Sequence, residues 1–215
     1  MSLRRDIANS IKKLVQNDLD TFMINISIST SLTLSDWMGV AEPGDYANRY
    51  LIDIELYLDD NYETKKVIGR SVCIYFGGFD WANDKFKDLA EIADSLSGSA
   101  LSAIFAVTDN NGQVIDDYMG CNVLYIEEFF LQPEYRDMGI GTMVFPLIID
   151  ILGRDAGVIT IIPTPNEDDG SRRSEIKDPD YQFHYNQICK FIMNYGFFCL
   201  DRGNRVWAKD TSKAD

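Results

Sequence analysis

The sequence is poor in histidine and has no closely spaced cysteine pair, and both scarcities limit the metal chemistry open to it. It has one histidine, His184, and four cysteines, none of which forms a C-x-x-C pair. Zinc sites of the Cys/His type need ligands at short, paired spacings, so we expect no metal site. The first residues carry charge with no apolar stretch behind them, unlike a secretory signal. Reduced thiols in a cytoplasmic protein are the expectation that follows.

Positive charge is also scarce. Lysine and arginine total 20 against 34 acidic residues, which gives a formal net charge of −14. Nucleic acids and anionic membranes are polyanions, so we expect a general affinity for neither. No run of about 18 apolar residues is present, which argues against a transmembrane helix. The acidic balance would suit a cationic substrate, although it is as often only a soluble surface.

What the sequence does have is a globular composition, with 46% hydrophobic and 25% charged residues in 215. That content excludes wholesale disorder and is enough for one large domain with a real core. Helix and strand patterns alternate without repeats or a linker, so we predict a single domain over 1–215 with a mixed α/β (α+β) sheet. The predicted helices are 4–17, one capped by Asn83 or Asp84 with Phe86 on its apolar face, 139–152 and 180–195. The predicted strands are 22–34, 51–58, 67–76, 122–131, 157–162, 197–200 and 206–208.

The segment from Leu131 to Thr142 carries the most information about function. It reads as a strand, a turn, a Gly-x-Gly step at Gly139 and Gly141, and then a helix that is apolar almost all round and is therefore predicted to be buried. Glycines at a helix start let backbone N–H groups approach a ligand, and the helix dipole adds about half a positive charge. Together they favour a phosphate or pyrophosphate site, although a plain strand-to-helix turn would read the same way. Pro146 inside this helix should cost about 3 kcal/mol if it lies beyond the first turn.

Two common phosphate motifs do not fit. A dinucleotide fingerprint needs a third glycine where this chain has Val144, and a P-loop needs a Gly-Lys-Ser/Thr run that is missing. The spacing Arg136-x-x-Gly139-x-Gly141, preceded by Pro133 and Tyr135, instead resembles the signature of the GNAT superfamily of N-acetyltransferases. The resemblance extends over about 121–208. It implies a central, mostly antiparallel, splayed sheet flanked by helices, and transfer of an acetyl group from acetyl-CoA to a primary amine.

The resemblance also implies which residues meet acetyl-CoA. The pyrophosphate would lie on the N–H groups of Met138, Gly139, Ile140, Gly141 and Thr142, close to Arg136 of the motif. The pantetheine arm would pair with the strand near Phe129 and Leu131. Asn186 occupies the place of an asparagine that often contacts the coenzyme in this family, although a solvated surface amide is an equal reading.

The catalytic residues are less defined. Many members of the family have a tyrosine four residues before a glycine that here is Gly196, as general acid for the thiolate, but this chain has Ile192 there. Tyr195 lies nearby and could serve, or could simply pack. Glu127 and Glu128 are base candidates, and as neighbours on a strand we expect them on opposite faces. His184 is a further candidate base, and the loop arginines Arg172 and Arg173 could meet a coenzyme phosphate.

Several questions stay open at this stage. The chain could be a catalytically inactive acyl-CoA-binding module of the same fold, or an unrelated interaction domain whose Gly-x-Gly is only a turn. The acceptor could be a small amine, an amino acid or a peptide. Residues 1–50 match nothing assignable, and 77–120 resemble an insertion. An exposed strand edge leaves a homodimer open.

Overall fold

The computed structural model describes residues 23–31, 46–57, 63–80, 85–115, 118, 120–173 and 179–212. Seven strands form one sheet in the order β1-β2-β3-β6-β7-β9-β8. Their bounds are β1 Met23–Ser31, β2 Ala47–Tyr57, β3 Lys65–Phe76, β6 Val123–Leu131, β7 Val158–Ile161, β8 Phe198–Asp201 and β9 Val206–Asp210. A two-stranded ribbon pairs β4 (Phe79–Asp80) with β5 (Lys85–Phe86), and the helices are α3 Leu89–Leu96, α4 Gly98–Phe105, α5 Ile140–Leu152 and α6 Tyr181–Met193.

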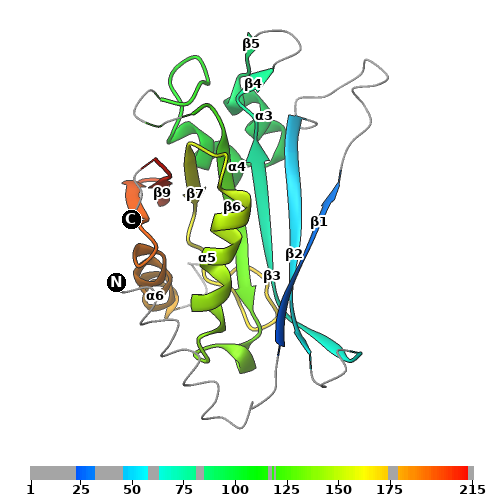
Figure 1. Cartoon of the computed structure of the whole chain (residues 1–215). Coiled ribbons are helices and arrows are strands. Elements are labelled where there is room, and N and C mark those ends of the chain that lie inside the picture. Colours follow the sequence, from blue (N-terminus) through cyan, green and yellow to red (C-terminus); the bar gives the residue numbers. More distant parts are fainter. Residues whose placement is uncertain are drawn as a thin grey trace.

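The sheet is antiparallel at every pairing except one, where β6 and β7 run parallel (Figure 1). The connection between these two strands is α5, as a parallel pair requires a crossover. The predicted mixed α/β class with a mostly antiparallel sheet flanked by helices is therefore confirmed. The predicted strand at 22–34 is β1, at one edge of the sheet. The predicted helix 4–17 lies outside the described residues.

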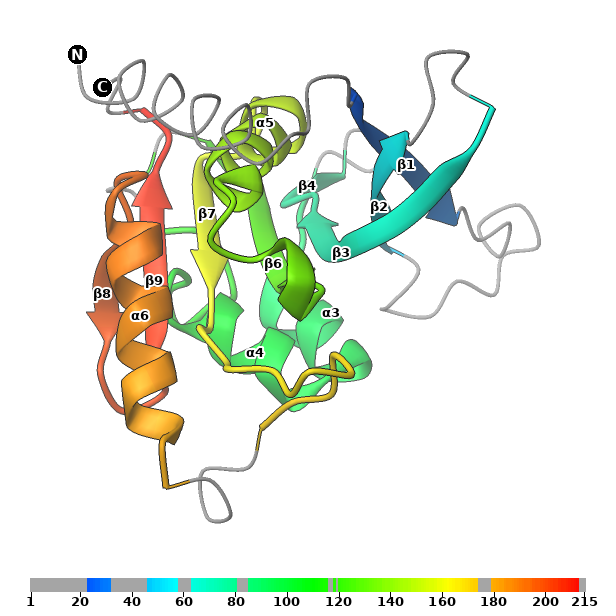
Figure 2. The same cartoon turned by 90° about the horizontal axis from the view of Figure 1, so that it is seen from below.

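Helices cover both faces of the sheet, and each layer has its own core (Figure 2). Alternate residues of β6 face opposite sides. Leu124 and Ile126 pack with α5 and α6, whereas Val123 and Tyr125 pack with α3 and α4. The segment 77–120, which looks like an insertion in the sequence, thus provides the helical layer over one face.

Two helix predictions need correction. The first helix of that layer is capped by Asp88, whose carboxylate accepts hydrogen bonds from the N–H groups of Ala90 and Glu91, and not by Asn83 or Asp84. Phe86 lies in β5 instead, where its ring stacks edge-on against Phe79. The second correction concerns α5, which is not buried all round, because Leu147 and Ile151 are about half exposed.

Candidate functional site

The parallel strands β6 and β7 separate halfway along their length. They pair from Val123 to Ile126 on β6 and from Val158 to Ile161 on β7, and β6 then continues alone to Leu131. The sequence gives a reason for the split. Pro163 and Pro165 come two and four residues after the end of β7, and proline has no N–H to donate to a ladder. The backbone of Glu127–Leu131 therefore has no described strand partner on the β7 side.

A cleft of about 390 Å³ occupies this split. Its walls are the second half of β6, the turn before α5, the segment after β7, and one face of α6. The apolar part of the lining includes Phe129, Leu131, Phe145, Ile161, Ile188 and Phe191, and the polar part includes Glu127, Glu128, Arg136, Asp137, Arg172, Arg173 and His184. The cleft thus combines an apolar trough with charged groups at its rim, as small-molecule sites commonly do.

The Gly-x-Gly step forms one end of the cleft. Gly139 is the N-cap of α5 in the left-handed conformation, with φ of 84°, and no side chain caps this helix. The N–H groups of the first turn have no acceptor within a helix, so those of Ile140, Gly141 and Thr142 remain available to a ligand. A Cβ added at Gly141 would lie 3.5 Å from Leu131 and 3.7 Å from Phe129, both in the cleft wall. A larger residue at 141 would therefore fill this end of the cleft.

Arg136, the first residue of the motif, shapes this turn. Its Nε donates to the carbonyl oxygen of Leu131 at 2.9 Å, and its guanidinium lies over the ring of Phe130. Its Nη1 also pairs with Asp168 at 3.3 Å. The arginine thus joins the end of β6 to the loop that follows β7.

Glu127 and Glu128 lie on the same face of the sheet, and the expectation of opposite faces is wrong. The register between β3 and β6 passes from Cys73 opposite Ile126 to Val72 opposite Glu128, so Glu127 is the extra residue of a β-bulge. A bulge interrupts the alternation that would otherwise separate neighbours. Both carboxylates consequently line the cleft.

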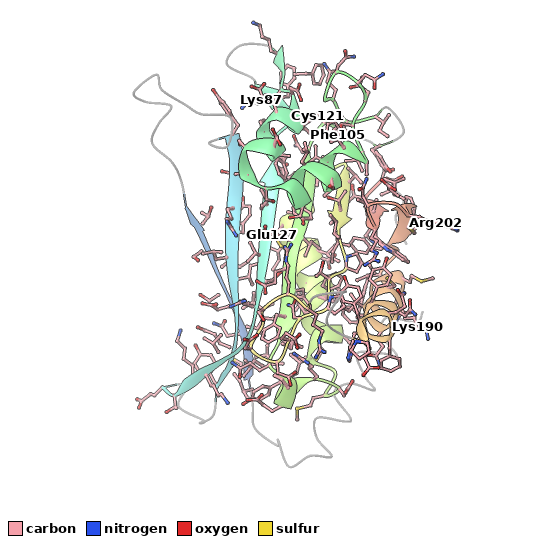
Figure 3. The ribbon with its side chains drawn as sticks, turned by 180° about the vertical axis from the view of Figure 1, so that it is seen from behind. Lys87, Phe105, Cys121, Glu127, Lys190 and Arg202 are labelled. Carbon is pink, nitrogen blue, oxygen red and sulfur yellow. The ribbon has the colours of Figure 1, made fainter. Side chains whose placement is uncertain are left out.

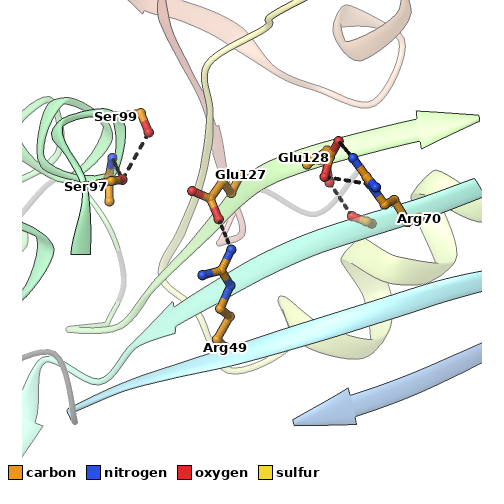
Figure 4. A network of polar contacts seen from close by, with 8 residues as sticks. Arg49, Arg70, Ser97, Ser99, Glu127 and Glu128 are labelled. Atoms are coloured by element: carbon orange, nitrogen blue, oxygen red, sulfur yellow. Dashed lines mark hydrogen bonds and ion pairs between the residues drawn. The ribbon is translucent and has the colours of Figure 1, made fainter. Parts of the chain in front are cut away.

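Each glutamate is paired with an arginine from a different strand (Figure 4). Arg49 of β2 reaches across β3 to place Nη2 2.9 Å from Oε2 of Glu127. Arg70 of β3 binds Glu128 through two hydrogen bonds of 3.1 Å, and this pairing raises the pKa of Arg70. Both oxygens of Glu128 are thus occupied, whereas Oε1 of Glu127 has no partner among the described residues.

A hairpin of residues 165–173 closes the cleft on the face of these glutamates. Asn166 and Arg172 form an antiparallel bridge, and Glu167 and Ser171 share a backbone hydrogen bond of 2.7 Å. The sheet holds the hairpin tip, since Arg70 donates to the carbonyl oxygen of Gly170 at 3.4 Å. We call this segment the cleft hairpin.

Four candidates from the sequence lie elsewhere or point elsewhere. The side chain of Ile140 is buried in the core and does not line the cleft, so only its N–H could serve a ligand there. The hydroxyl of Tyr195 donates to the carbonyl oxygen of Thr142 at 3.2 Å, and Tyr195 is buried and absent from the cleft lining. Asn186 is exposed on α6 and accepts a hydrogen bond from Gln182. Met138 packs against the core on the α5 side and likewise does not line the cleft.

His184 and Gln187 line the cleft from α6 instead of Asn186. Ile192, in the place of the expected tyrosine, is also in the lining and only 1% exposed. The sequence did not single out Arg49, Arg70 or Gln187. Nothing in the spacing of a strand arginine indicates which carboxylate it will meet two strands away.

Two further features concern the described part of the chain. It contains no group of three or more histidine, cysteine or acidic residues arranged to hold a metal ion. None of its helices has both the length and the apolar character needed to cross a membrane.

Comparison with known proteins yields a distant likeness of structure. No family model matches the sequence, and no curated protein matches it. Among solved structures, the chain is similar to the one described as the crystal structure of the loading GNATL domain of CurA from Lyngbya majuscula, with 14% identity, 75% of each chain covered and a TM-score of 0.31. We draw no functional conclusion from a likeness at this level.

Proposed function

We propose that this protein is an acyl-CoA-dependent N-acyltransferase that moves an acetyl group from acetyl-CoA to a primary amine by direct attack in a ternary complex. The observation that carries the proposal is the uncapped start of α5 at one end of a cleft between two splayed strands. From the start of α5 and along β6, the cleft offers three features in turn. These are the anion-binding amides of α5, the unpaired backbone of β6, and the carboxylate of Glu127.

The amides of Ile140, Gly141 and Thr142 would bind the pyrophosphate, supported by those of Met138 and Gly139 in the preceding turn. The backbone of β6 at Phe129 and Leu131 would pair with the amides of the pantetheine arm. Arg136 would hold the turn before α5 in place, because its guanidinium already contacts the carbonyl oxygen of Leu131 and the carboxylate of Asp168. The thioester would then lie toward the bulge at Glu127.

Glu127 is the better candidate for the general base. Its pair with Arg49 uses one oxygen and leaves Oε1 toward the cleft, and its side chain is 16% exposed. Glu128 has both oxygens on Arg70, and the same arginine holds the cleft hairpin, so Glu128 has a positioning role.

In the reaction, the amine nitrogen attacks the thioester carbonyl carbon. A C–N bond forms, the C–S bond breaks, and the coenzyme leaves as its thiolate. The proton lost by the amine goes to Glu127, directly or through a water, and the thiolate takes a proton from solvent. The backbone N–H groups of β6 beside the bulge would stabilise the charge that develops on the carbonyl oxygen.

A second candidate is an acyl-CoA-binding module without transfer activity, and Ile192 favours it. A buried isoleucine cannot donate a proton to the departing thiolate, and it stands where many members of the GNAT superfamily carry a tyrosine. This alternative expects coenzyme binding with no acetyl transfer to any amine.

The test compares two glutamates on the same strand. Release of coenzyme thiol from acetyl-CoA is followed with a panel of primary amines in the wild type, Glu127→Gln and Glu128→Gln, and acetyl-CoA affinity is measured separately. We expect Glu127→Gln to lower kcat/KM by about 10²–10⁴-fold at unchanged coenzyme affinity. We expect Glu128→Gln to stay within about tenfold of the wild type, since its loss leaves the proton acceptor in place.

An equal loss in both variants would show that Glu127 is not the base. Coenzyme binding without turnover of any amine by the wild type would favour the inactive module.

A further inference from the structure

One arginine of the cleft has no ion-pair partner among the described residues. Five of the chain's ten arginines lie in or beside the cleft, although the chain has a net charge of −14. Four of them pair with carboxylates: Arg49 with Glu127, Arg70 with Glu128, Arg136 with Asp168, and Arg173 with Glu167. The fifth is Arg172. It lines the cleft from the cleft hairpin, near Tyr125, where its charge opposes the burial that raises the pKa of that tyrosine.

Arg172 lies toward the Tyr125 end of the cleft, and the start of α5, where the coenzyme phosphates would bind, is at the other end. Its neighbour Tyr125 and Leu131, at the α5 end of β6, are six positions apart on one strand. At about 3.3 Å per residue, these positions are roughly 20 Å apart. Arg172 therefore belongs to the end of the cleft where Glu127 lies. Glu127 is two residues after Tyr125 on β6, and the acceptor nitrogen would lie beside it.

The neighbouring pair of Arg49 and Glu127 is exposed enough to be exchanged for a ligand. The Arg49 side chain is 55% exposed and that of Glu127 16%, so solvent reaches the pair from the side of the arginine and weakens it. An amine that approached Glu127 would nevertheless weaken the pair and leave Arg49 with less of its counter-charge. A carboxylate on the same ligand would restore it, and guanidinium groups bind carboxylates through two parallel hydrogen bonds.

On the basis of the proposed function, we infer that the acceptor carries a carboxylate close to its amine, as an amino acid does. The amine lies against Glu127 and the carboxylate lies on Arg172, which lines the same cleft, while Arg49 pairs with Oε2 of Glu127 (Figure 4). The cleft thus recognises a zwitterion, because Glu127 presents a negative charge to the amine and Arg172 presents a positive charge to the carboxylate. Simple amines lack the second contact and are the poorer acceptors.

The experiment compares each common L-amino acid with its own amide. The amide keeps the side chain and the amine and removes only the negative charge, and rates are corrected for the fraction of each amine that is unprotonated. We expect the best amino acid to exceed its amide in kcat/KM by roughly tenfold or more, the size of one charge-assisted contact. In Arg172→Gln, that preference falls to within about twofold while acetyl-CoA affinity is unchanged.

The control is Arg202→Gln. Arg202 is exposed in the turn between β8 and β9, on the α6 side of the molecule and away from Glu127 (Figure 3). This variant has the same change of charge and should keep the full preference for amino acids.

Equal rates for amino acids and amides would overturn the inference, as would a preference that survives in Arg172→Gln. A third result against it would be an Arg172-dependent preference for succinyl-CoA over acetyl-CoA with amide acceptors. The carboxylate would then belong to the acyl group.

Calorimetry of the same amino acids and amides with the protein separates this inference from the proposed function. Binding of an amino acid that depends on Arg172, in a protein that transfers no acetyl group, would support the ligand class and refute the transferase. Acetyl transfer to amides and amino acids alike, with no difference in binding, would support the transferase and refute the ligand class.

Discussion

The Tyr195 hydroxyl donates its hydrogen bond to the one carbonyl of α5 that Pro146 leaves without a helical donor. That carbonyl belongs to Thr142, four residues before the proline, and the two oxygens are 3.2 Å apart. Tyr195, two residues after the end of α6, thus supplies the missing donor to the first turn of α5, whose N–H groups form the proposed pyrophosphate site. The geometry gives Tyr195 a structural role in the fold.

Replacing Tyr195 with Phe should lower stability by about 1 kcal/mol, because a buried carbonyl loses its donor. The melting temperature would fall by about 2–4 °C for a chain of this size. In a Pro146→Ala background, residue 146 regains its N–H and the same substitution should cost less. Thermal unfolding of the four proteins of this double-mutant cycle gives the coupling. If the losses of stability in the two single variants simply add in the double variant, Tyr195 does not compensate for Pro146. A large loss of kcat at unchanged stability in Tyr195→Phe would instead identify Tyr195 as a general acid.

Replacing Gly141 with Trp should weaken acetyl-CoA binding strongly without unfolding the protein. The new side chain would extend into the cleft, where its Cβ already contacts Leu131 and Phe129 at ordinary distances. Affinity measured by calorimetry should fall by roughly tenfold or more, the loss of about one charged contact. Gly98→Trp is the matched control, since a Cβ at that exposed position meets nothing within 4 Å. Unchanged affinity in Gly141→Trp would remove the site assignment.

The buried carboxylate of Glu55 should make stability depend on pH. Hydrogen bonds from Lys65 at 2.6 Å and from Asn25 at 2.9 Å lower the pKa of Glu55 in the folded protein. Because the pKa of Glu55 is lower in the folded protein than in the unfolded chain, the ionised carboxylate stabilises the fold. This stabilisation is fully present above the unfolded pKa and is lost as the pH falls through the folded pKa. The difference in melting temperature between wild type and Glu55→Gln should be full at about pH 6–7 and fade below about pH 4.

Asp150→Asn, an exposed acid on α5, serves as the control for that series. A difference between wild type and Glu55→Gln that stays constant from neutral to acid pH would show that Glu55 acts through packing and not through its charge.

Much of the sheet and the helices could be predicted from periodicity, because long amphipathic segments follow their burial. The strands of 121–210 and the helices α5 and α6 lie within a few residues of their predicted ranges. The split between β6 and β7 could be anticipated from Pro163 and Pro165, which cannot donate backbone hydrogen bonds to a continued strand. The cap of α3 could not be predicted, because Asn83, Asp84 and Asp88 are all capping residue types. The pairing of β5 with β4 places Phe86 in a strand and leaves Asp88 to begin the helix.

The site was less predictable, and the glutamates show why. Alternation along β6 holds until the bulge, where one extra residue brings Glu127 and Glu128 to the same face. The bulge arises from how β3 and β6 pair, which is a long-range property that no local pattern records. The same is true of Arg49 and Arg70, whose partners lie 78 and 58 residues away along the chain. The placement of Arg172 similarly depends on how the cleft hairpin folds back onto β3 and β6.

The measurement that tests the account most directly is thermal unfolding with and without acetyl-CoA, with ATP and NADH as controls. At about 100 times its dissociation constant, a ligand adds roughly 2.7 kcal/mol to stability, a rise of about 5–11 °C for a chain of this length. The account predicts this rise with acetyl-CoA alone. No shift at high concentrations of acetyl-CoA, or an equal shift with ATP, would contradict an acyl-CoA site at the start of α5.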